Sequence, residues 1–274
     1  MADRVVLDQV ALTRHGPTLT LRLAAGQSLA VVGRANAGKS RFLSVLSRSE
    51  SPPRGSVSVT GNVFEANGVE PGRRVRPQSL AASSGPGSSE RAARALSAVA
   101  LWNARKSPMS ELSPGQRRAA TLLRALVSEA EVVVIDGLLD ELDPWTQSDV
   151  LSLLRARMRT GQSVCIATNL PSLAAQMDVL VVMAEQEVRF AGSPAELVRA
   201  ATMSRLEVHS ESHPAVRALV RPFEVTITDS GETLRLEAAE GQQLAAKLLL
   251  EGYGDVKFVV LCQPTVERAL LDLL

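Results

Sequence analysis

The clearest chemistry in this sequence lies in a glycine-rich segment at residues 33–40. Its letters, G-R-A-N-A-G-K-S, match the pattern G-x-x-x-x-G-K-S of a loop that binds phosphate. Small residues let backbone N–H groups surround a β-phosphate, the lysine places its charge on the β and γ oxygens, and a following helix adds its dipole. The segment predicts a nucleoside triphosphate site formed by Gly33, Arg34, Ala35, Asn36, Ala37, Gly38, Lys39, Ser40 and Arg41.

Two residues are predicted to hold Mg²⁺ beside the phosphates. Ser40 offers a hydroxyl directly after the lysine, and Asp136 offers a carboxylate at the end of the apolar run 132–135. An ordinary aspartate at a strand end is the alternative for Asp136. The intact phosphate loop favours the metal role, with Asp136 acting directly or through water.

Composition excludes several classes of protein. A formal net charge of +1 argues against a dedicated nucleic-acid binder, so no nucleic-acid partner is expected. Cys165 and Cys262 lie far apart inside apolar runs, which predicts two buried thiols. No apolar run is long enough to cross a bilayer, and the start M-A-D-R lacks a signal core. We expect a cytoplasmic protein that reaches the membrane through a partner.

The elements that must position these groups alternate between strands and helices. An apolar run at 28–32 leads into the phosphate loop, and three further runs predict buried strands at 131–135, 163–168 and 177–183. Helical segments between them imply a parallel sheet covered on both faces. The other expected elements are helices at 39–48, 90–104 and 114–128, a strand at 56–64, and a flexible insert at 81–90.

The order of elements changes near residues 201–205, which predicts domains at 1–203 and 204–274. The second domain reads as strand, helix, strand, strand, helix and strand, with one further helix appended. A turn at Asp229-Ser230-Gly231 fits a hairpin between the middle strands. This order is typical of a small α+β, ferredoxin-like unit.

A second motif identifies a family. The segment Leu112-Ser113-Pro114-Gly115-Gln116 contains an S-x-x-Q capping box with proline at the first helical position, which leaves the Gly115 amide free to meet an anion. It is similar to the L-S-G-G-Q signature of ABC transporter nucleotide-binding subunits. The chain resembles these proteins over residues 1–200.

The resemblance implies a P-loop NTPase fold of the ABC type that binds ATP and Mg²⁺. It implies that Ser113, Gly115 and Gln116 face an ATP bound by an opposite subunit, and that Gln78 contacts Mg²⁺ or water. Leu142-Asp143 matches the loop that crosses the dimer interface. The helical subdomain, at about 79–128, is short for the family. The expected partners are a transmembrane permease subunit and a second ABC ATPase.

The C-terminal unit resembles the accessory domain of ABC-2 exporters, which move drugs, lipids, polysaccharides or motility components. The segment 264–270, P-T-V-E-R-A-L, is similar to a motif that ends this group of proteins. A plain docking helix is the alternative reading of that segment.

Several positions depart from the family. Gly137 stands where the family has the glutamate that polarises water, and loss of a general base costs about 10²–10⁴ in rate. Asn169 replaces the switch histidine, and an amide cannot carry the proton that histidine carries. Arg41 replaces a small hydroxyl residue, and the turn at His15 lacks the aromatic residue that stacks on adenine. The nearby acids Asp140 and Glu141 are expected to face the partner subunit.

The sequence therefore predicts an impaired ABC subunit with no confident catalytic residue of its own. It would bind Mg·ATP at a dimer interface and complement a competent ATPase, which favours a heterodimer; a homodimer is the alternative. A second hypothesis is an ATP-dependent assembly or gating protein of a membrane complex, without transport. A third is an active exporter ATPase that uses Asp140 or Glu141 as a substitute base.

Overall fold

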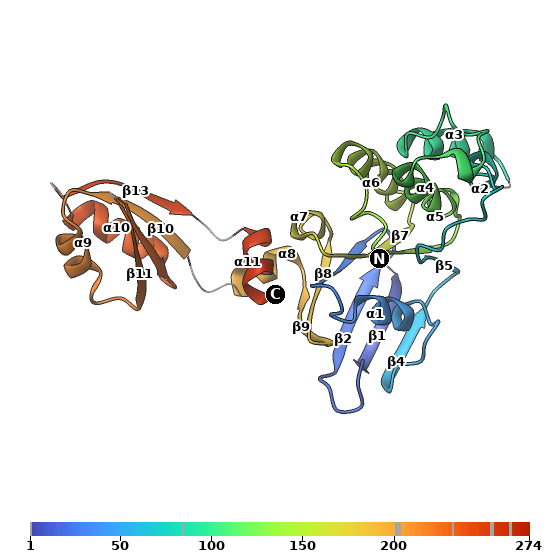
Figure 1. Ribbon diagram of the computed structural model, residues 1–274. Coiled ribbons are helices and arrows are strands. Elements are labelled where there is room, and N and C mark those ends of the chain that lie inside the picture. The colour runs from blue at the N-terminus through green and yellow to red at the C-terminus, as the bar shows by residue number, and fades with distance from the viewer. Residues whose placement is uncertain (1, 84, 201–203, 232, 253–254, 263–264) are drawn as a thin grey trace. The chain divides into compact units, whose positions relative to one another are not determined.

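The computed structural model describes residues 2–83, 85–200, 204–231, 233–252, 255–262 and 265–274. Backbone contacts divide the chain into two compact units, Met1–Pro194 with Leu273–Leu274, and Ala195–Asp272. Each unit is described by itself (Figure 1). The boundary predicted at 203/204 and the start of the predicted C-terminal motif at residue 264 lie outside the described residues, so the predicted domain limits stay a prediction.

A six-stranded sheet of order β5-β6-β7-β3-β8-β9 forms the centre of the first unit. All neighbouring pairs are parallel except β8 with β9. The middle strands are buried along almost their whole length, because other elements cover both faces of the sheet. This confirms the predicted parallel α/β core. The strand bounds are β3 Ser28–Val32, β5 Val63–Ala66, β6 Val132–Asp136, β7 Ser163–Thr168, β8 Val179–Ala184 and β9 Glu187–Gly192.

A second, antiparallel sheet of order β2-β1-β4 packs beside it. Its strands are β1 (Asp3–Ala11), β2 (Leu19–Ala24) and β4 (Arg54–Val59). The single strand predicted at 56–64 is wrong, because β4 ends in this sheet and β5 begins in the parallel one. Gly61 lies between them with a left-handed φ of 93°, and a Cβ there would lie 2.8 Å from that of Glu131. The chain thus changes sheets at a point that requires glycine.

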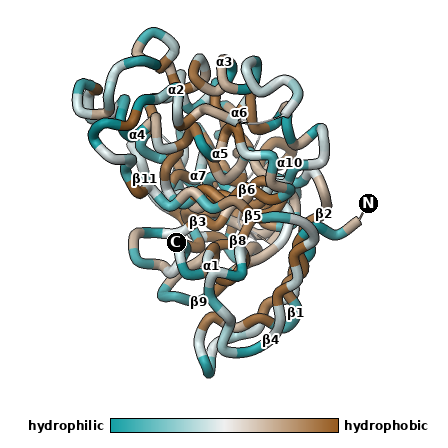
Figure 2. Tube along the Cα trace, turned by 90° about the vertical axis from the view of Figure 1, so that its right-hand side faces the viewer, coloured by the Kyte–Doolittle hydropathy of each residue, from teal (hydrophilic) through white to brown (hydrophobic). Residues whose placement is uncertain are grey.

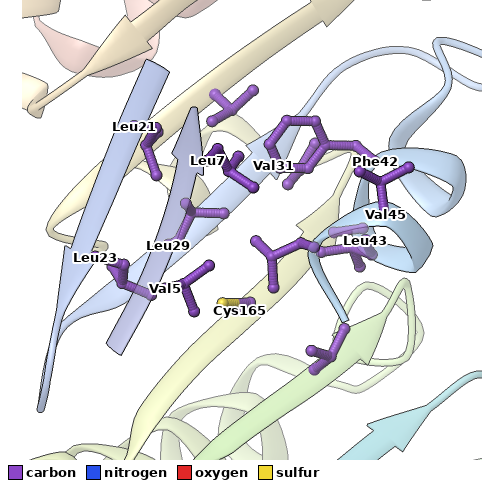
Figure 3. Packing of buried hydrophobic residues seen from close by; sticks show 14 of the residues in the cluster. Val5, Leu7, Leu21, Leu23, Leu29, Val31, Phe42, Leu43, Val45 and Cys165 are labelled. Carbon is purple, nitrogen blue, oxygen red and sulfur yellow. The ribbon is translucent and has the colours of Figure 1, made fainter. Parts of the chain in front are cut away.

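Helix α1 (Lys39–Leu46) and the antiparallel sheet share one hydrophobic core on one face of the parallel sheet. Figure 3 shows Phe42, Leu43 and Val45 of α1 pointing toward strand residues such as Leu29 and Val31. Hydrophobic colouring follows the central strands in Figure 2. This core fixes the N-terminal end of α1, and with it the phosphate loop, against the carboxyl edge of the sheet.

The remaining helices of the first unit depart from the predicted ones in two places. The segment 114–128 forms two helices that meet at Leu122, and the helix expected to reach residue 104 ends at Ala98, because Ala100 has a left-handed φ of 54°. Arg157 donates to the carbonyl oxygens of Leu126 and Ser128, at the C-terminal end of the second of these helices. The helices are α2 Pro77–Leu80, α3 Ser88–Ala98, η1 Met109–Glu111, α4 Pro114–Thr121, α5 Leu123–Val127, α6 Pro144–Met158 and α7 Pro171–Ala174.

The second unit contains an antiparallel sheet of order β11-β12-β10-β13 with α9 and α10 on one face. Its element order and strand order are those of a split βαβ, ferredoxin-like unit, as predicted. Cys262 ends β13 and is exposed, so the prediction of a buried thiol is wrong there and correct for Cys165. The elements are α8 Pro194–Ala200, β10 Ser204–Ser210, α9 His213–Val220, β11 Val225–Ser230, β12 Thr233–Ala238, α10 Gly241–Glu251, β13 Val256–Cys262 and α11 Val266–Leu273.

None of the helices within the described residues has both the length and the apolar character needed to span a bilayer.

Candidate nucleotide-binding site

The phosphate loop connects β3 to α1 and requires glycine at both ends. A Cβ on Gly33 would lie 2.4 Å from the carbonyl oxygen of Met183, on the neighbouring strand β8. Gly38 has a left-handed φ of 96° at the N-cap of α1. Both positions therefore exclude larger residues, one by contact and the other by backbone conformation.

The N-terminus of α1 has free backbone donors. Gly38 has no side chain to cap the helix, and none of the described side chains accepts a hydrogen bond at its N-cap. The leading N–H groups of a helix need partners from outside the helix, and an anion satisfies them while interacting with the helix dipole. The loop therefore fits the phosphates of a nucleotide.

Lys39 lies at the centre of the site. Its Nζ donates hydrogen bonds to the carbonyl oxygens of Gly33 at 2.9 Å and Arg34 at 2.8 Å, and to Asn169 Oδ1 at 2.7 Å. Burial lowers the pKa of Lys39, and the nearby carboxylates of Asp140 and Asp136 oppose that shift. The ammonium group is thus held among oxygen atoms at the edge where β3 and β7 end.

Asp140 lies at this site and is held by contacts within its own chain. The expectation that it faces a partner subunit stays a prediction. The Asp140 carboxylate accepts a hydrogen bond from the Thr168 hydroxyl and another, of 2.6 Å, from the backbone N–H of Asn169. Burial raises the pKa of Asp140, although these hydrogen bonds and the charge of Lys39 lower it in part. Glu141 forms an ion pair with Arg118 on α4.

The sequence named Asp140 only as a candidate substitute base, because its contacts at the site depend on a distant loop. The contact joins the turn after β6 to the turn after β7, which are adjacent only because the two strands pair. The parallel pairing was predicted from the apolar runs, but the side-chain direction within the turn was not. Two carboxylates, Asp136 and Asp140, therefore act on the Lys39 charge from this edge.

Gly137 follows β6 where a glutamate is expected in the family. Its N–H donates to the carbonyl oxygen of Ala167 at 3.2 Å, and its φ of 67° is left-handed. Apart from the two chain neighbours, no atom of the described residues lies within 4 Å of the position that a Cβ would take. The position therefore has room for a side chain, but its backbone conformation favours glycine.

The residues predicted to hold Mg²⁺ fit that ion in number and kind. Asp136 ends β6, and Ser40 is the second residue of α1. The described residues contain no group of three or more His, Cys, Asp or Glu side chains that could hold a metal. Mg²⁺ is ordinarily held by one or two protein oxygens together with substrate phosphates and water, so two ligands suffice here.

Gln78, the third predicted ligand, lies in α2. Its backbone N–H donates to the carbonyl oxygen of Arg105 at 3.0 Å. Within the described residues, no hydrogen bond or ion pair joins its side chain to Lys39, Ser40 or Asp136. Its metal role therefore stays a prediction.

Asn67 is a candidate that the sequence did not single out. It is the first residue after β5, whose last residue, Ala66, pairs in parallel register with Ile135 of β6. Asn67 therefore follows β5 at the same edge of the sheet as Asp136. Its amide oxygen is of the type that can bind Mg²⁺ or a water on it. The strand register is the signal that points to it.

The signature segment forms the predicted capping box at the start of α4. Ser113 Oγ accepts from the N–H of Gln116 at 3.2 Å, and Gln116 Oε1 accepts from the N–H of Ser113 at 3.0 Å. Gly115 has open space around it. Among the residues that the structure describes, no hydrogen bond or ion pair joins these three residues to the phosphate loop.

The two remaining departures lie at the surface. Arg41 Nε forms an ion pair with Glu50, beyond the end of α1, at 2.9 Å, so its charge already has a partner. His15 is exposed in the turn between β1 and β2.

Comparison with known proteins agrees with this geometry. The family model described as ABC transporter matches residues 17–139. The Nod factor export ATP-binding protein I of Burkholderia orbicola is 28% identical over 252 residues, which are 84% of this chain and 83% of that protein. The taurine import ATP-binding protein TauB of Pseudomonas aeruginosa is 30% identical over 198 residues, 66% of this chain and 73% of that protein.

Solved structures show the same fold. A bacterial Atm1-family ABC exporter with ATP bound matches with a TM-score of 0.62 and 20% identity, over 72% of this chain and 40% of that one. An ATP-binding cassette dimer in a post-hydrolysis state, bound to ADP and Pi, matches with a TM-score of 0.58 and 18% identity, over 69% and 98%. The chain belongs to the ATP-binding subunits of ABC transporters.

Proposed function

We propose that this subunit binds Mg·ATP at a dimer interface and holds it with little or no hydrolysis. The observation that carries the proposal is Gly137, which offers no group to polarise water directly after the metal residue Asp136. Loss of a general base costs about 10²–10⁴ in rate. The phosphate loop keeps its two glycines, Lys39 and Ser40, which supports binding without turnover.

Asn169 supports the same proposal. Its side-chain oxygen accepts a hydrogen bond from Lys39, so the amide is already part of the phosphate site. An amide can donate to a γ-phosphate through its nitrogen, but it cannot carry a proton at neutral pH. The residue therefore suits binding better than turnover.

The intact signature gives the subunit a second role. Ser113, Gly115 and Gln116 begin a well-capped helix whose N-terminus suits an anion. We place them opposite ATP bound by a second ABC ATPase. A complete signature beside an incomplete hydrolytic site favours a heterodimer, in which this chain completes the competent site of its partner. A transmembrane permease subunit is the other proposed partner.

Similarity to an export protein supports the assignment of this chain to an exporter. The match to Nod factor export ATP-binding protein I spans 84% of this chain, whereas the match to the taurine import protein spans 66%. A match over 84% of the chain is longer than the first unit, so it must include part of the C-terminal unit. We therefore place the chain with exporters of the kind that carry such a unit.

The test is nucleotide binding and hydrolysis by the purified chain. Isothermal titration calorimetry with Mg·ATP should show binding, while a phosphate-release assay should show negligible turnover. Addition of the partner ATPase should restore hydrolysis. Robust hydrolysis by the chain alone that is abolished by Lys39→Ala would refute the proposal.

Asp140 is the residue to examine if the chain does hydrolyse ATP. Its carboxylate lies at the site and acts on Lys39, which makes it the better placed of the two candidate bases. Asp140→Asn should then abolish turnover, whereas Glu141→Gln should leave turnover unchanged. Residual hydrolysis in Asp140→Asn would exclude this residue as the base.

A further inference from the structure

The edge of the C-terminal sheet is formed by an unusually apolar strand. β13 is the last strand in the order β11-β12-β10-β13 of the described residues, and it pairs on one side only, with β10. Its regular part, residues 258–262, reads F-V-V-L-C and carries no charge. The free N–H and C=O groups of such an edge can pair with another strand.

The helix-free face of β13 exposes large side chains. Val259 and Leu261 point toward the core under α9 and α10, whereas Phe258 is 48% exposed and Val260 is 43% exposed. His209 on β10 stacks on Phe258 with the ring centres 4.1 Å apart, which holds that ring on the open face. Apolar side chains and unpaired backbone groups therefore occur together at one edge.

The strand is self-complementary in antiparallel register. A two-fold axis through Val260 pairs Val260 with itself, Phe258 with Cys262, and Val259 with Leu261 of the second copy. Every pair is apolar and keeps its side chains on matching faces. The ladder with β10 has a register shift between His209 and Ser210, which places Lys257 at the irregular start, outside the paired segment.

The opposite edge of the sheet lacks this complementarity. β11 carries Asp229, whose carboxylate forms ion pairs with Arg217 at 2.5 Å and His213 at 3.1 Å. Its outward residues are mostly polar, including Thr226 and Thr228. Charged and polar residues are the usual protection of an edge strand, and the regular part of β13 lacks them.

We propose that two copies of this chain associate through antiparallel pairing of their β13 edges, centred on Val260, without nucleotide. The contact uses only the C-terminal unit. It is therefore separate from the ATP-dependent interface proposed above, which uses the phosphate loop and the signature helix.

Sedimentation equilibrium of the full chain without nucleotide tests the proposal. The wild-type chain and Lys39→Ala should both be dimeric at micromolar concentration. Val260→Lys places two like charges opposite each other at the axis and should raise the dimer dissociation constant at least about tenfold. Thr228→Lys, the matched change on the other edge, should leave it unchanged. A monomeric wild-type chain, or equal effects of the two lysines, would overturn the proposal.

Crosslinking tests the register. In a Cys262→Ser background, Val260→Cys should be joined efficiently to a second copy by a short bis-maleimide, because paired Cβ atoms lie about 4.5–5.5 Å apart. Thr228→Cys in the same background is the control and should remain monomeric on a denaturing gel. Circular dichroism and ATP binding should be the same for all variants. Equal crosslinking of both cysteines, or none, would contradict pairing centred on Val260.

Discussion

Lys39 Nζ donates a hydrogen bond of 2.7 Å to Asn169 Oδ1, joining the phosphate loop to the turn after β7. The contact suits an amide, because its oxygen accepts from an ammonium group without adding a like charge. A protonated histidine at this position would repel Lys39. Asn169 thus places a neutral acceptor beside Lys39 and leaves the position without a titratable group.

Lys39→Ala should weaken Mg·ATP binding by about tenfold to a hundredfold. The reason is the loss of charge-assisted hydrogen bonds to phosphate, each contributing about 1.5–3 kcal/mol. Calorimetric titration measures the change. Lys106→Ala removes the same side chain from an exposed site in the helical region and should bind ATP as the wild type does. Equal affinities of wild type and Lys39→Ala would exclude Lys39 from the phosphate site.

Gly137→Ala should lower the free energy of unfolding by about 1–2 kcal/mol, the cost of left-handed backbone for a residue with a Cβ. No neighbour would clash, so conformation alone accounts for the loss. Gly137→Asn should lower the free energy of unfolding less than Gly137→Ala does, because asparagine adopts the left-handed conformation more readily. Urea denaturation compares them, with Gly115→Ala as a glycine change in helical backbone. An undiminished free energy in Gly137→Ala would show that the turn relaxes.

Ser113→Ala should destabilise α4 by about 1 kcal/mol through loss of its cap, and should reduce hydrolysis by the partner ATPase. ATP binding by this chain should not change. Ser212→Ala removes a similar cap from α9 and provides the control. It should cost comparable stability and leave partner hydrolysis intact. If both changes reduce hydrolysis equally, the signature acts through stability alone.

The raised pKa of Asp140 predicts that the stability of the protein depends on pH. Because burial raises its pKa in the folded protein, the folded state binds more protons than the unfolded state between the unfolded value of 3.8 and the raised one. Protonation of Asp140 therefore stabilises the fold as pH falls through this window. Relative to Asp140→Asn, the wild type should gain stability between neutral pH and about pH 4. Chemical denaturation at several pH values measures the difference, and a constant difference would contradict the raised pKa.

The two cysteines should differ in reactivity. Burial raises the pKa of Cys165 to about 12, so little reactive thiolate forms at pH 8, whereas Cys262 is exposed. Native protein should therefore release one equivalent of thionitrobenzoate rapidly from Ellman's reagent, and unfolded protein two. Native Cys262→Ser should not react. Rapid reaction of that variant would show that β7 opens readily.

The sequence alone determined the phosphate loop, the capping box of α4, the parallel sheet and the ferredoxin-like unit. Each depends on local information: glycines at fixed spacing, a serine and a glutamine within one helical turn, or continuous apolar runs. The absence of a base at Gly137 was equally visible, because it requires only the identity of the residue after the strand that ends in Asp136.

Only the tertiary structure decided how separate turns meet. In the structure, Asp140 contacts the turn after β7, and Asn169 accepts a hydrogen bond from Lys39. Asn67 follows β5 at the same sheet edge as Asp136, and β13 is an edge strand of its sheet. These contacts join residues distant in the sequence, and their geometry follows from strand order and register. Side-chain periodicity predicts that a strand exists, but it carries no information about which strand lies beside it.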